Sequence, residues 1–335
     1  MKKLLVVTDA WHPQINGVVR ATDAQVRILK ERGYDVVIIH PGQFMSVPLP
    51  FSPDIRLAVL PGRRVAALIK RGHFDAVHIV AEGPLGWAAR RACVRLKIPF
   101  TTSLHTRFDL YFGRYVAWFL MPAVLWLLRR FHGPATRTMV STETFKKQLE
   151  GQGFRNVVVV PLGVDADIFT RNSRTPVEAL PHPVFVYFGR LAHEKDPEEF
   201  LRLDLPGTKL VVGDGPLRAS LERRYPDARF IGFKRGQELV DWLSVCDVFV
   251  FPSKTETFGL VVLEALAMGI PVAAYDVMGP RDILKNGVHG YLSDDLRQAA
   301  LDCLDLNPQE CRKRALEFSW AASAEAFIKN LEPVR

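Results

Sequence analysis

Short apolar runs rich in β-branched residues alternate with helical patterns along the whole chain, and this alternation limits the possible folds more than any other feature. Strands are expected at 4–8, 35–39, 76–80, 100–104, 138–141, 157–160, 184–188, 209–212, 229–233, 248–251 and 272–274. Helices are expected near 84–96, 196–204, 216–224, 236–245, 259–268, 295–305 and 308–331. Near-continuous apolar strands separated by helices are typical of a parallel sheet that is covered on both faces.

The rhythm of strands and helices occurs twice, once in each half of the chain. A chain of 335 residues suits two cores rather than one. Residues 161–183 are rich in Pro and polar residues and are read as a linker. We therefore expect an α/β protein with two Rossmann-like, doubly wound parallel-sheet domains, residues 1–168 and 178–317. In such sheets the ligand lies beyond the carboxyl ends of the strands, so a cleft between two facing edges would hold two substrates.

Charge is divided unevenly between the two halves. The net charge of +8 consists of 23 Lys and Arg against 12 Asp and Glu in residues 1–170, or +11, and 21 against 24 in residues 171–335, or −3. This asymmetry predicts an anionic partner for the first half, either nucleic acid or an anionic membrane surface.

The cysteines and the apolar runs indicate the compartment. Cys93, Cys246, Cys303 and Cys311 form no C-x-x-C pair and are read as buried thiols in a reducing environment. The first apolar run, 4–7, is shorter than the roughly 7–15 residues of an export signal. No stretch reaches the roughly 18 apolar residues of a membrane span, so we expect a cytoplasmic protein.

Two loops at expected strand ends carry features of phosphate binding. In "DAWHPQINGVV" (9–19), Gly17 opens a helix, where the missing Cβ lets backbone N–H groups approach a phosphate. In "YFGRLAHEKD" (187–196), Arg190 offers a planar fork for phosphate oxygens and Lys195 a mobile point charge. Each signal is weak alone, since a glycine turn or solvated surface cations give the same pattern.

A third loop joins a buried strand to an apolar helix in "VFVFPSKTETFGLVVLEALAMG" (248–269). Glu256 lies in the loop and Glu264 lies within the helix, among apolar neighbours. Eight helical residues span about 12 Å, whereas paired glycosidase carboxyls need roughly 5–9.5 Å. The spacing therefore favours contacts with two ends of one elongated ligand over a hydrolase pair. The amides of Thr257, Phe258, Gly259 and Leu260 fall at the helix start, which attracts anions.

Taken together, these loops resemble those of a known family over almost the whole chain. The chain is similar to retaining, nucleotide-sugar-dependent glycosyltransferases of family 4 with the GT-B fold, and especially to bacterial glycolipid α-glycosyltransferases. The resemblance rests on "NGVV" (16–19), "SLHT" (103–106), "PLGVD" (161–165), "GRLAHEK" (189–195), "GDGP" (213–216) and the E-x7-E motif in "PSKTETFGLVVLEALAMGIPV" (252–272). In this family a final segment, here 318–335, packs back on the first domain.

The resemblance assigns a role to each candidate site residue. The implied catalytic residues are Glu256, which contacts the transferred sugar, His105 near the reacting carbon, and Arg190 and Lys195, which neutralise the leaving diphosphate. The implied donor-binding residues are Gly17, Arg190, Lys195, Gly213, Phe233, Glu256, Phe258, Gly259, Leu260 and Glu264, with Glu264 on the ribose diol and Phe233 near the base. The donor is a UDP- or GDP-sugar, and no other cofactor is expected.

The resemblance also implies a reaction without a metal ion. The only D-x-D, Asp165–Asp167, lies in the linker and is read as a turn rather than a divalent-ion site. In such families the acceptor attacks on the face that the diphosphate leaves, and the anomeric configuration is retained. Either His105 or the leaving phosphate takes the acceptor's proton, and the sequence leaves both open.

An unusual apolar segment in the first half indicates the acceptor. Residues 116–128 carry no charge and are flanked by Arg114, Arg129 and Arg130, which suits an interfacial helix on an anionic membrane, although a buried helix gives the same pattern. We therefore expect transfer of a hexose to a membrane lipid such as diacylglycerol, by a protein peripheral to the inner face of the cell membrane. The alternative acceptor is soluble or a lipopolysaccharide or polysaccharide.

Two other protein classes fit the sequence less well. A dinucleotide-dependent oxidoreductase needs G-x-G-x-x-G after a first strand, and neither half has it. A nucleic-acid-binding protein would account for the basic first half, but no binding motif accompanies the charge, so no nucleic-acid partner is expected.

Overall fold

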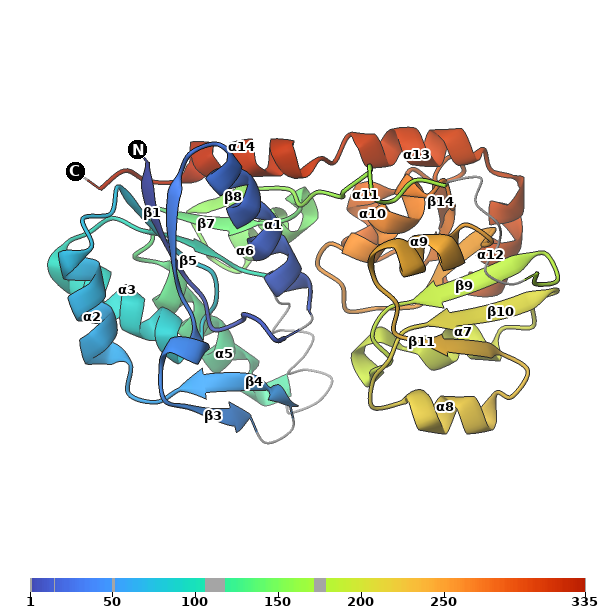
Figure 1. Ribbon diagram of the computed structural model, residues 1–335, viewed down its shortest axis with the longest axis horizontal. Helices are drawn as coiled ribbons and strands as arrows, with labels where there is room; N and C mark the ends of the chain where they lie inside the picture. The colour runs from blue at the N-terminus through green and yellow to red at the C-terminus, as the bar shows by residue number, and fades with distance from the viewer. Residues whose placement is uncertain (1, 15, 50–51, 106–117, 172–178, 335) are drawn as a thin grey trace. The chain divides into compact units, whose positions relative to one another are not determined.

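The computed structural model describes residues 2–14, 16–49, 52–105, 118–171 and 179–334. The chain forms two compact units (Figure 1). Unit 1 consists of Met1–Leu162 with Trp320–Arg335, and unit 2 of Gly163–Ser319. Residues 163–170 are tied to unit 2 because Arg312 donates to the carbonyl of Phe169 (2.8 Å) and to the hydroxyl of Thr170 (2.9 Å).

Unit 1 contains a six-stranded parallel sheet with the order β2-β1-β5-β6-β7-β8. Its strands are β1 (Lys3–Val7), β2 (Asp35–Ile39), β5 (Ala76–Ile79), β6 (Thr101–Ser103), β7 (Arg137–Val140) and β8 (Val157–Val159). Its helices are α1 (Gly17–Glu31), α2 (Gly62–Arg71), α3 (Pro84–Leu96), α5 (Met121–His132), α6 (Glu143–Gly151) and α14 (Trp320–Asn330).

Alternate residues of β1 show how both faces of this sheet become covered. Leu5 and Val7 pack in a core with α2 and α3, whereas Leu4 and Val6 pack in a second core with α1 and α14. Successive side chains of a strand point to opposite faces, so a strand between two helical layers must be apolar throughout. This is why β1 reads as a continuous apolar run.

Unit 2 repeats the architecture with the strand order β11-β10-β9-β12-β13-β14. Its strands are β9 (Val184–Phe188), β10 (Thr208–Val212), β11 (Arg229–Gly232), β12 (Val248–Phe251), β13 (Val272–Ala274) and β14 (Gly290–Leu292). Its helices are α7 (Pro197–Arg202), α8 (Arg218–Arg224), α9 (Gly236–Leu243), α10 (Leu260–Ala267), α11 (Pro280–Ile283), α12 (Leu296–Asp302) and α13 (Pro308–Leu316).

Each strand predicted from the sequence is present within one residue at either end. The sequence reading missed the antiparallel hairpin β3 (Ser46–Leu49) with β4 (Ser52–Ala58), and it missed β14, α2, α6 and α11. The single helix expected over 308–331 was wrong. It breaks into α13 and α14 because the backbone of Phe318 and Ser319 pairs with Val164 instead of continuing the helix.

After this break the chain ends within unit 1. Helix α14 packs against α1, and Phe327 meets the His78 ring edge-on at 4.8 Å between ring centroids. The following residues pair with the amino end of β5, where the Val334 amide donates to the Asp75 carbonyl (2.7 Å). The terminal segment is therefore part of the core of unit 1 and not a tail.

Candidate functional site

Four candidate residues of unit 2 follow the carboxyl ends of four neighbouring strands. Phe233 follows β11, Gly213 follows β10, Arg190 follows β9, and Glu256 lies in the loop after β12. The order β11-β10-β9-β12 places these loops side by side along one edge of the sheet. The chain reverses its direction of travel across the sheet between β9 and β12, and such a switch point is where doubly wound sheets bind ligands.

The loop after β9 is held by main-chain contacts that leave the Arg190 side chain exposed. The Tyr187 hydroxyl donates to the Arg190 carbonyl (2.8 Å), and the Leu191 amide donates to the Asp214 carbonyl (2.9 Å). Gly213 packs closely beneath this loop, since a Cβ there would lie 1.9 Å from the Gly189 carbonyl oxygen. These contacts therefore fix the backbone of Arg190, while its exposed side chain stays available to an anion.

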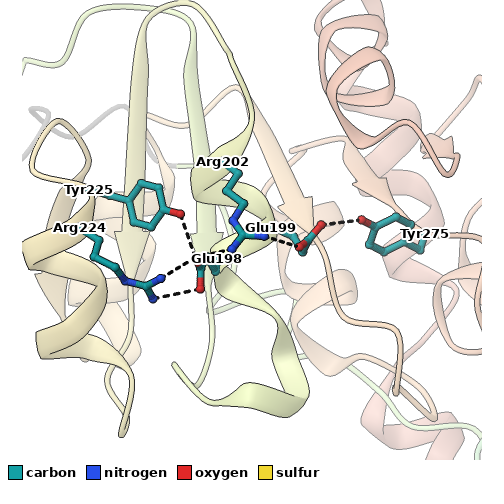
Figure 2. A network of polar contacts seen from close by, with 6 residues as sticks. All are labelled: Glu198, Glu199, Arg202, Arg224, Tyr225 and Tyr275. Atoms are coloured by element: carbon teal, nitrogen blue, oxygen red, sulfur yellow. Dashed lines mark hydrogen bonds and ion pairs between the residues drawn. The ribbon is translucent and has the colours of Figure 1, made fainter. Parts of the chain in front are cut away.

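A polar network fastens the start of α7, the helix that follows Lys195 in the chain (Figure 2). The Glu198 carboxylate accepts two hydrogen bonds from Arg224 (2.6 and 3.0 Å) and one from the Tyr225 hydroxyl (3.0 Å). Arg224 in particular holds the pKa of Glu198 below its usual value. The neighbouring Glu199 accepts from Tyr275 (3.4 Å), so α7 is fastened on both sides just after Lys195.

The Lys195 ammonium and the Glu256 carboxylate meet in an ion pair of 2.6 Å. Both are largely buried, with 28% and 16% of their side chains exposed. The other carboxylate oxygen of Glu256 accepts from the Thr257 amide (3.1 Å). Burial alone would raise the pKa of Glu256, but Lys195 and the amides of Thr257 and Phe258 outweigh it, so the pKa lies below its usual value. Glu256 is therefore ionised. Its carboxylate is held by the Lys195 ammonium and by the Thr257 amide, which lies just before the next helix.

Helix α10 begins directly after this ion pair. Gly259 precedes its first residue with a φ of +89°, a left-handed conformation that favours glycine. No side chain caps the helix start, which leaves the backbone donors of the first turn near Glu256. Glu264 lies one turn inside the helix and is 3% exposed, so it does not lie on a solvated face. The sequence reading of Glu264 as a buried carboxylate among apolar neighbours is confirmed.

Phe233 is an exposed aromatic residue at this edge, with 47% of its surface accessible. An exposed ring beside the Gly213 loop is suited to stacking on a flat ligand. Arg190, Lys195, Gly213, Phe233, Glu256 and the α10 start thus gather at the carboxyl edge of one sheet.

In unit 1, Gly17 and His105 follow different strands of the other sheet. Gly17 is the first residue of α1, whose start is capped by Asn16 accepting from the Val19 amide (3.0 Å). A Cβ at Gly17 would meet nothing within 4 Å. His105 follows β6, and burial lowers its pKa to about 4, with Glu82 opposing and His132 reinforcing the shift. The His105 imidazole is therefore neutral near pH 7.

The sequence reading missed three polar residues near this edge of the unit 1 sheet. Asp9 follows β1 and Glu82 follows β5, the two strands next in line to β6. His132 ends α5 and bonds through Nε2 to Glu82 Oε1 (3.1 Å). A search for every carboxylate just after a strand end would have found Asp9 and Glu82. His132 could not be found in that way, because it reaches the edge from a helix far along the chain.

The apolar segment of unit 1 forms a short 3-10 turn, Trp118–Leu120, followed by α5. Its apolar side chains are largely exposed: Phe119 is 67%, Leu120 40%, Trp126 57% and Leu127 47% exposed. Only the last turns are buried, through Leu128, Phe131 and His132. The reading of this segment as a buried helix is therefore wrong for 119–127, and residues 106–117 lie outside the described part of the chain.

Two further expectations from the sequence concern the D-x-D segment, read as a turn rather than a metal site, and the helices, read as unable to span a membrane. Residues 166–168 of the D-x-D segment form a turn, as predicted. Among the described residues, no group of three or more His, Cys, Asp or Glu is arranged to hold a metal ion. Within the same described part of the chain, every helix is too short or too polar to cross a bilayer.

Comparison with known proteins gives two family matches. Residues 15–168 match Glycosyltransferase Family 4, and residues 182–306 match Glycosyl transferases group 1. The chain is 29% identical over 306 residues to a GDP-mannose-dependent alpha-mannosyltransferase of Mycobacterium tuberculosis, covering 84% of this chain and 81% of the relative. It is 30% identical over 295 residues to the sulfoquinovosyl transferase SQD2 of Arabidopsis thaliana, covering 79% of this chain and 58% of that protein.

The fold has solved counterparts. The structure of Anabaena Alr3699/HepE in complex with UDP-glucose superposes with a TM-score of 0.70 at 15% identity, covering 98% of this chain and 99% of that one. The two parallel sheets, the two family matches and this likeness agree with one another. The chain belongs to the family 4 glycosyltransferases and has the GT-B fold.

Proposed function

We propose that unit 2 binds a nucleoside-diphosphate sugar along the edge formed by the loops after β11, β10, β9 and β12. The observation that carries this proposal is the Lys195–Glu256 pair beside the uncapped start of α10, on the same sheet edge as the exposed Arg190. A diphosphate needs fixed positive charge and backbone donors, and this edge offers two cations and a helix start. A family 4 relative that uses GDP-mannose and a neighbour solved with UDP-glucose support a donor of this class.

The ion pair suggests how donor binding prepares the site. Glu256 now accepts from Lys195 and from the amide that precedes α10. An incoming diphosphate competes for both donors, which releases the Glu256 carboxylate to accept from hydroxyl groups of the sugar. Arg190 and Lys195 then stabilise the charge that develops on the leaving diphosphate, the electrostatic contribution that usually dominates such catalysis. Because the chain supplies these cations, the proposed reaction is independent of a metal ion.

The remaining roles are proposed as the resemblance to the family implies them. Glu264 binds the ribose diol, and Phe233 with the Gly213 backbone holds the base. The reaction is proposed to retain the anomeric configuration, as the resemblance to retaining members of the family implies. Burial holds the pKa of His105 at about 4, so its imidazole is a poor acceptor for a hydroxyl proton at neutral pH. We therefore assign the proton to the leaving phosphate, with His105 contacting the sugar.

The acceptor is proposed to be a membrane lipid, such as diacylglycerol. Support comes from the exposed apolar side chains of 119–127, which precede the exposed Arg129 and Arg130. An apolar helix with terminal cations is suited to an anionic bilayer surface, where the apolar face enters the headgroup region. The donor class and the lipid acceptor are separate proposals, and each has its own test.

Donor binding is tested by a thermal-shift panel of UDP-, GDP- and ADP-sugars, followed by product analysis with diacylglycerol in buffer that contains EDTA. We expect stabilisation by a UDP- or GDP-sugar and an α-glycosylated lipid formed without added metal. Inversion of the anomeric centre, or a product that requires a divalent ion, contradicts the mechanism. Transfer only to soluble or polysaccharide acceptors favours the alternative acceptor.

Membrane binding is tested by flotation with anionic liposomes. The double variant Trp126→Ser/Leu127→Ser is expected to lose most of the floated protein. The matched control is Leu316→Ser, which removes an exposed apolar side chain (56% exposed) from unit 2. Flotation of the double variant equal to that of the control, or no flotation of the unsubstituted protein at moderate salt, removes the lipid proposal.

A further inference from the structure

The edge of the unit 1 sheet has its own switch point, between β1 and β5. From β1 the chain moves outward to β2 and then returns to the other side of β1 to form β5. Helix α3 starts at Pro84, directly beyond this point. Ligands of doubly wound sheets bind at such a position, so the side chains that line it are the first candidates for contacts with a substrate. The residue that leads into α3 here is Glu82.

A buried chain of hydrogen bonds fixes the Glu82 carboxylate. The hydroxyls of Thr138 on β7 and Thr102 on β6 lie 3.1 Å apart, and Thr102 lies 2.9 Å from His132 Nδ1. His132 Nε2 lies 3.1 Å from Glu82 Oε1. An ionised carboxylate only accepts, so Nε2 carries the proton, and in the neutral imidazole Nδ1 then accepts from Thr102. Each hydrogen bond of this series is therefore donated in the direction from the sheet interior towards Glu82.

The loop that carries Glu82 is also fixed through its main chain, by contacts with Asp9. Asp9, which is 6% exposed, accepts from the amides of Leu85 (2.9 Å) and Gly86 (3.0 Å) at the start of α3. Gly83 lies so close that a Cβ there would be 2.3 Å from the Asp9 carboxyl carbon. Two separate contacts therefore hold this loop. Asp9 holds the main chain that follows Glu82, and His132 holds the Glu82 side chain.

Glu82 remains open to a ligand despite these contacts. Its side chain is 17% exposed, whereas the His132 side chain is fully buried. A carboxylate has about four lone-pair positions, and one N–H from His132 leaves room for a hydroxyl donor. Glu82 is also close enough to His105 to oppose the lowering of the histidine's pKa. Glu82 is therefore a rigidly held carboxylate with accepting capacity left for a ligand.

We infer that Glu82 binds the acceptor hydroxyl in unit 1, that His132 is its positioning residue, and that the pair selects an uncharged acceptor group over a phosphorylated one. This inference rests on the proposed function. A hydroxyl donates to the carboxylate, whereas a phosphate next to the acceptor hydroxyl brings negative charge close to Glu82 and to the nearby Asp9. Rejection of like charge is a common source of specificity, separate from attraction to the correct ligand. In this proposal the basic surface of unit 1 attracts the anionic membrane, and Glu82 at the edge of its sheet discriminates between the lipids.

The test compares neutral and phosphorylated acceptors in vesicles of constant surface charge. Diacylglycerol and phosphatidylinositol are offered separately to the unsubstituted protein and to Glu82→Gln. Glu150→Gln is the matched control, because it removes one negative charge from an exposed position of unit 1. Donor affinity and the slow hydrolysis of donor without acceptor are measured for every variant.

We expect Glu82→Gln to raise KM for diacylglycerol by about tenfold or more, as for loss of a hydrogen bond to a charged group. The ratio of kcat/KM for the two lipids should shift towards phosphatidylinositol by a similar factor, while donor affinity and donor hydrolysis match those of Glu150→Gln. His132→Phe should behave like Glu82→Gln. His132→Gln, whose amide can still donate to Glu82, should recover part of the loss, which a purely structural role would not give.

The outcomes separate this inference from the proposed function. If the unsubstituted protein binds no nucleotide sugar, the proposed function fails. If the donor binds but neither lipid accepts sugar, the lipid acceptor of the proposed function fails, and the inference fails with it. If the donor binds and phosphatidylinositol is the better substrate, only the inference about Glu82 is overturned. It is also overturned if Glu82→Gln and Glu150→Gln have the same acceptor KM values.

Discussion

Gly213 offers the sharpest test of the geometry at the edge of unit 2. Its φ of +154° lies in a region almost restricted to glycine. In the Gly213→Ala variant the new methyl group would lie 1.9 Å from the Gly189 carbonyl oxygen, far inside van der Waals contact. Backbone strain of about 1–3 kcal/mol and overpacking of about 1–3 kcal/mol together predict a loss of about 2–6 kcal/mol in the free energy of unfolding.

The same clash predicts a functional effect. The Gly189 carbonyl immediately precedes Arg190, so relief of the overlap displaces the guanidinium and weakens donor binding. For a unit of about 150 residues the expected loss lowers Tm by roughly 5–20 °C. Tm is measured by calorimetry, and donor affinity by titration with UDP- and GDP-sugars.

Gly236→Ala is the matched control for this variant. Its φ is +53°, but a Cβ there would meet nothing within 4 Å. Only the left-handed backbone cost of about 1–2 kcal/mol applies, and donor affinity should be unchanged. If Gly213→Ala unfolds at the same temperature as the control and binds donor equally well, the packing of the Gly213 loop against Gly189 is not as described.

The remaining predictions concern two carboxylates, one glycine and one buried acid. Glu264→Ala should weaken nucleotide binding while Glu256→Ala mainly lowers kcat, and equal negligible effects would contradict both roles. Gly17→Ala should leave Tm unchanged, because a Cβ there meets nothing, yet lower kcat if a phosphate approaches the start of α1. Burial raises the pKa of Asp9 from 3.8 to about 6, so the folded state binds this proton more tightly than the unfolded state. The stabilising effect of this proton is complete below pH 3.8 and falls by about 3 kcal/mol as the pH rises through 6. The denaturant midpoint of unit 1 should therefore fall as the pH rises over this range. The Asp9→Asn variant should lack this pH dependence.

The sequence predicted the strands well because these strands are buried on both faces. A strand such as β9, with every residue buried, has an unbroken apolar run whose ends are marked by polar residues or glycine. The β3–β4 hairpin was missed for the opposite reason. It lies outside the main sheet, and the exposed Val47 and Pro48 of β3 do not alternate cleanly with polar residues.

The site was predictable where the motif and the chemistry coincide in one segment. Arg190 and Lys195 share one short segment, Glu256 and Glu264 share another, and the structure pairs Lys195 with Glu256 as their charges suggest. The break after α13 was not predictable, because it depends on pairing between Ser319 and a residue far back in the chain.

The polar chain behind Glu82 was hidden for a similar reason. His132 ends an apolar helix, and Thr102 and Thr138 read as ordinary β-strand residues. Only the parallel pairing of β6 with β7 brings the two hydroxyls together. Contacts of this kind depend on the tertiary fold and leave no local pattern.

The central claim is that the carboxyl edge of the unit 2 sheet binds a nucleoside diphosphate. The most direct measurement is a crystal structure of the protein grown with UDP or GDP. We expect the diphosphate to contact Arg190 and Lys195 at the start of α10, with the Lys195–Glu256 pair opened and Glu264 on the ribose. A nucleotide bound elsewhere on unit 2, or this edge without nucleotide at saturating concentration, would contradict the account.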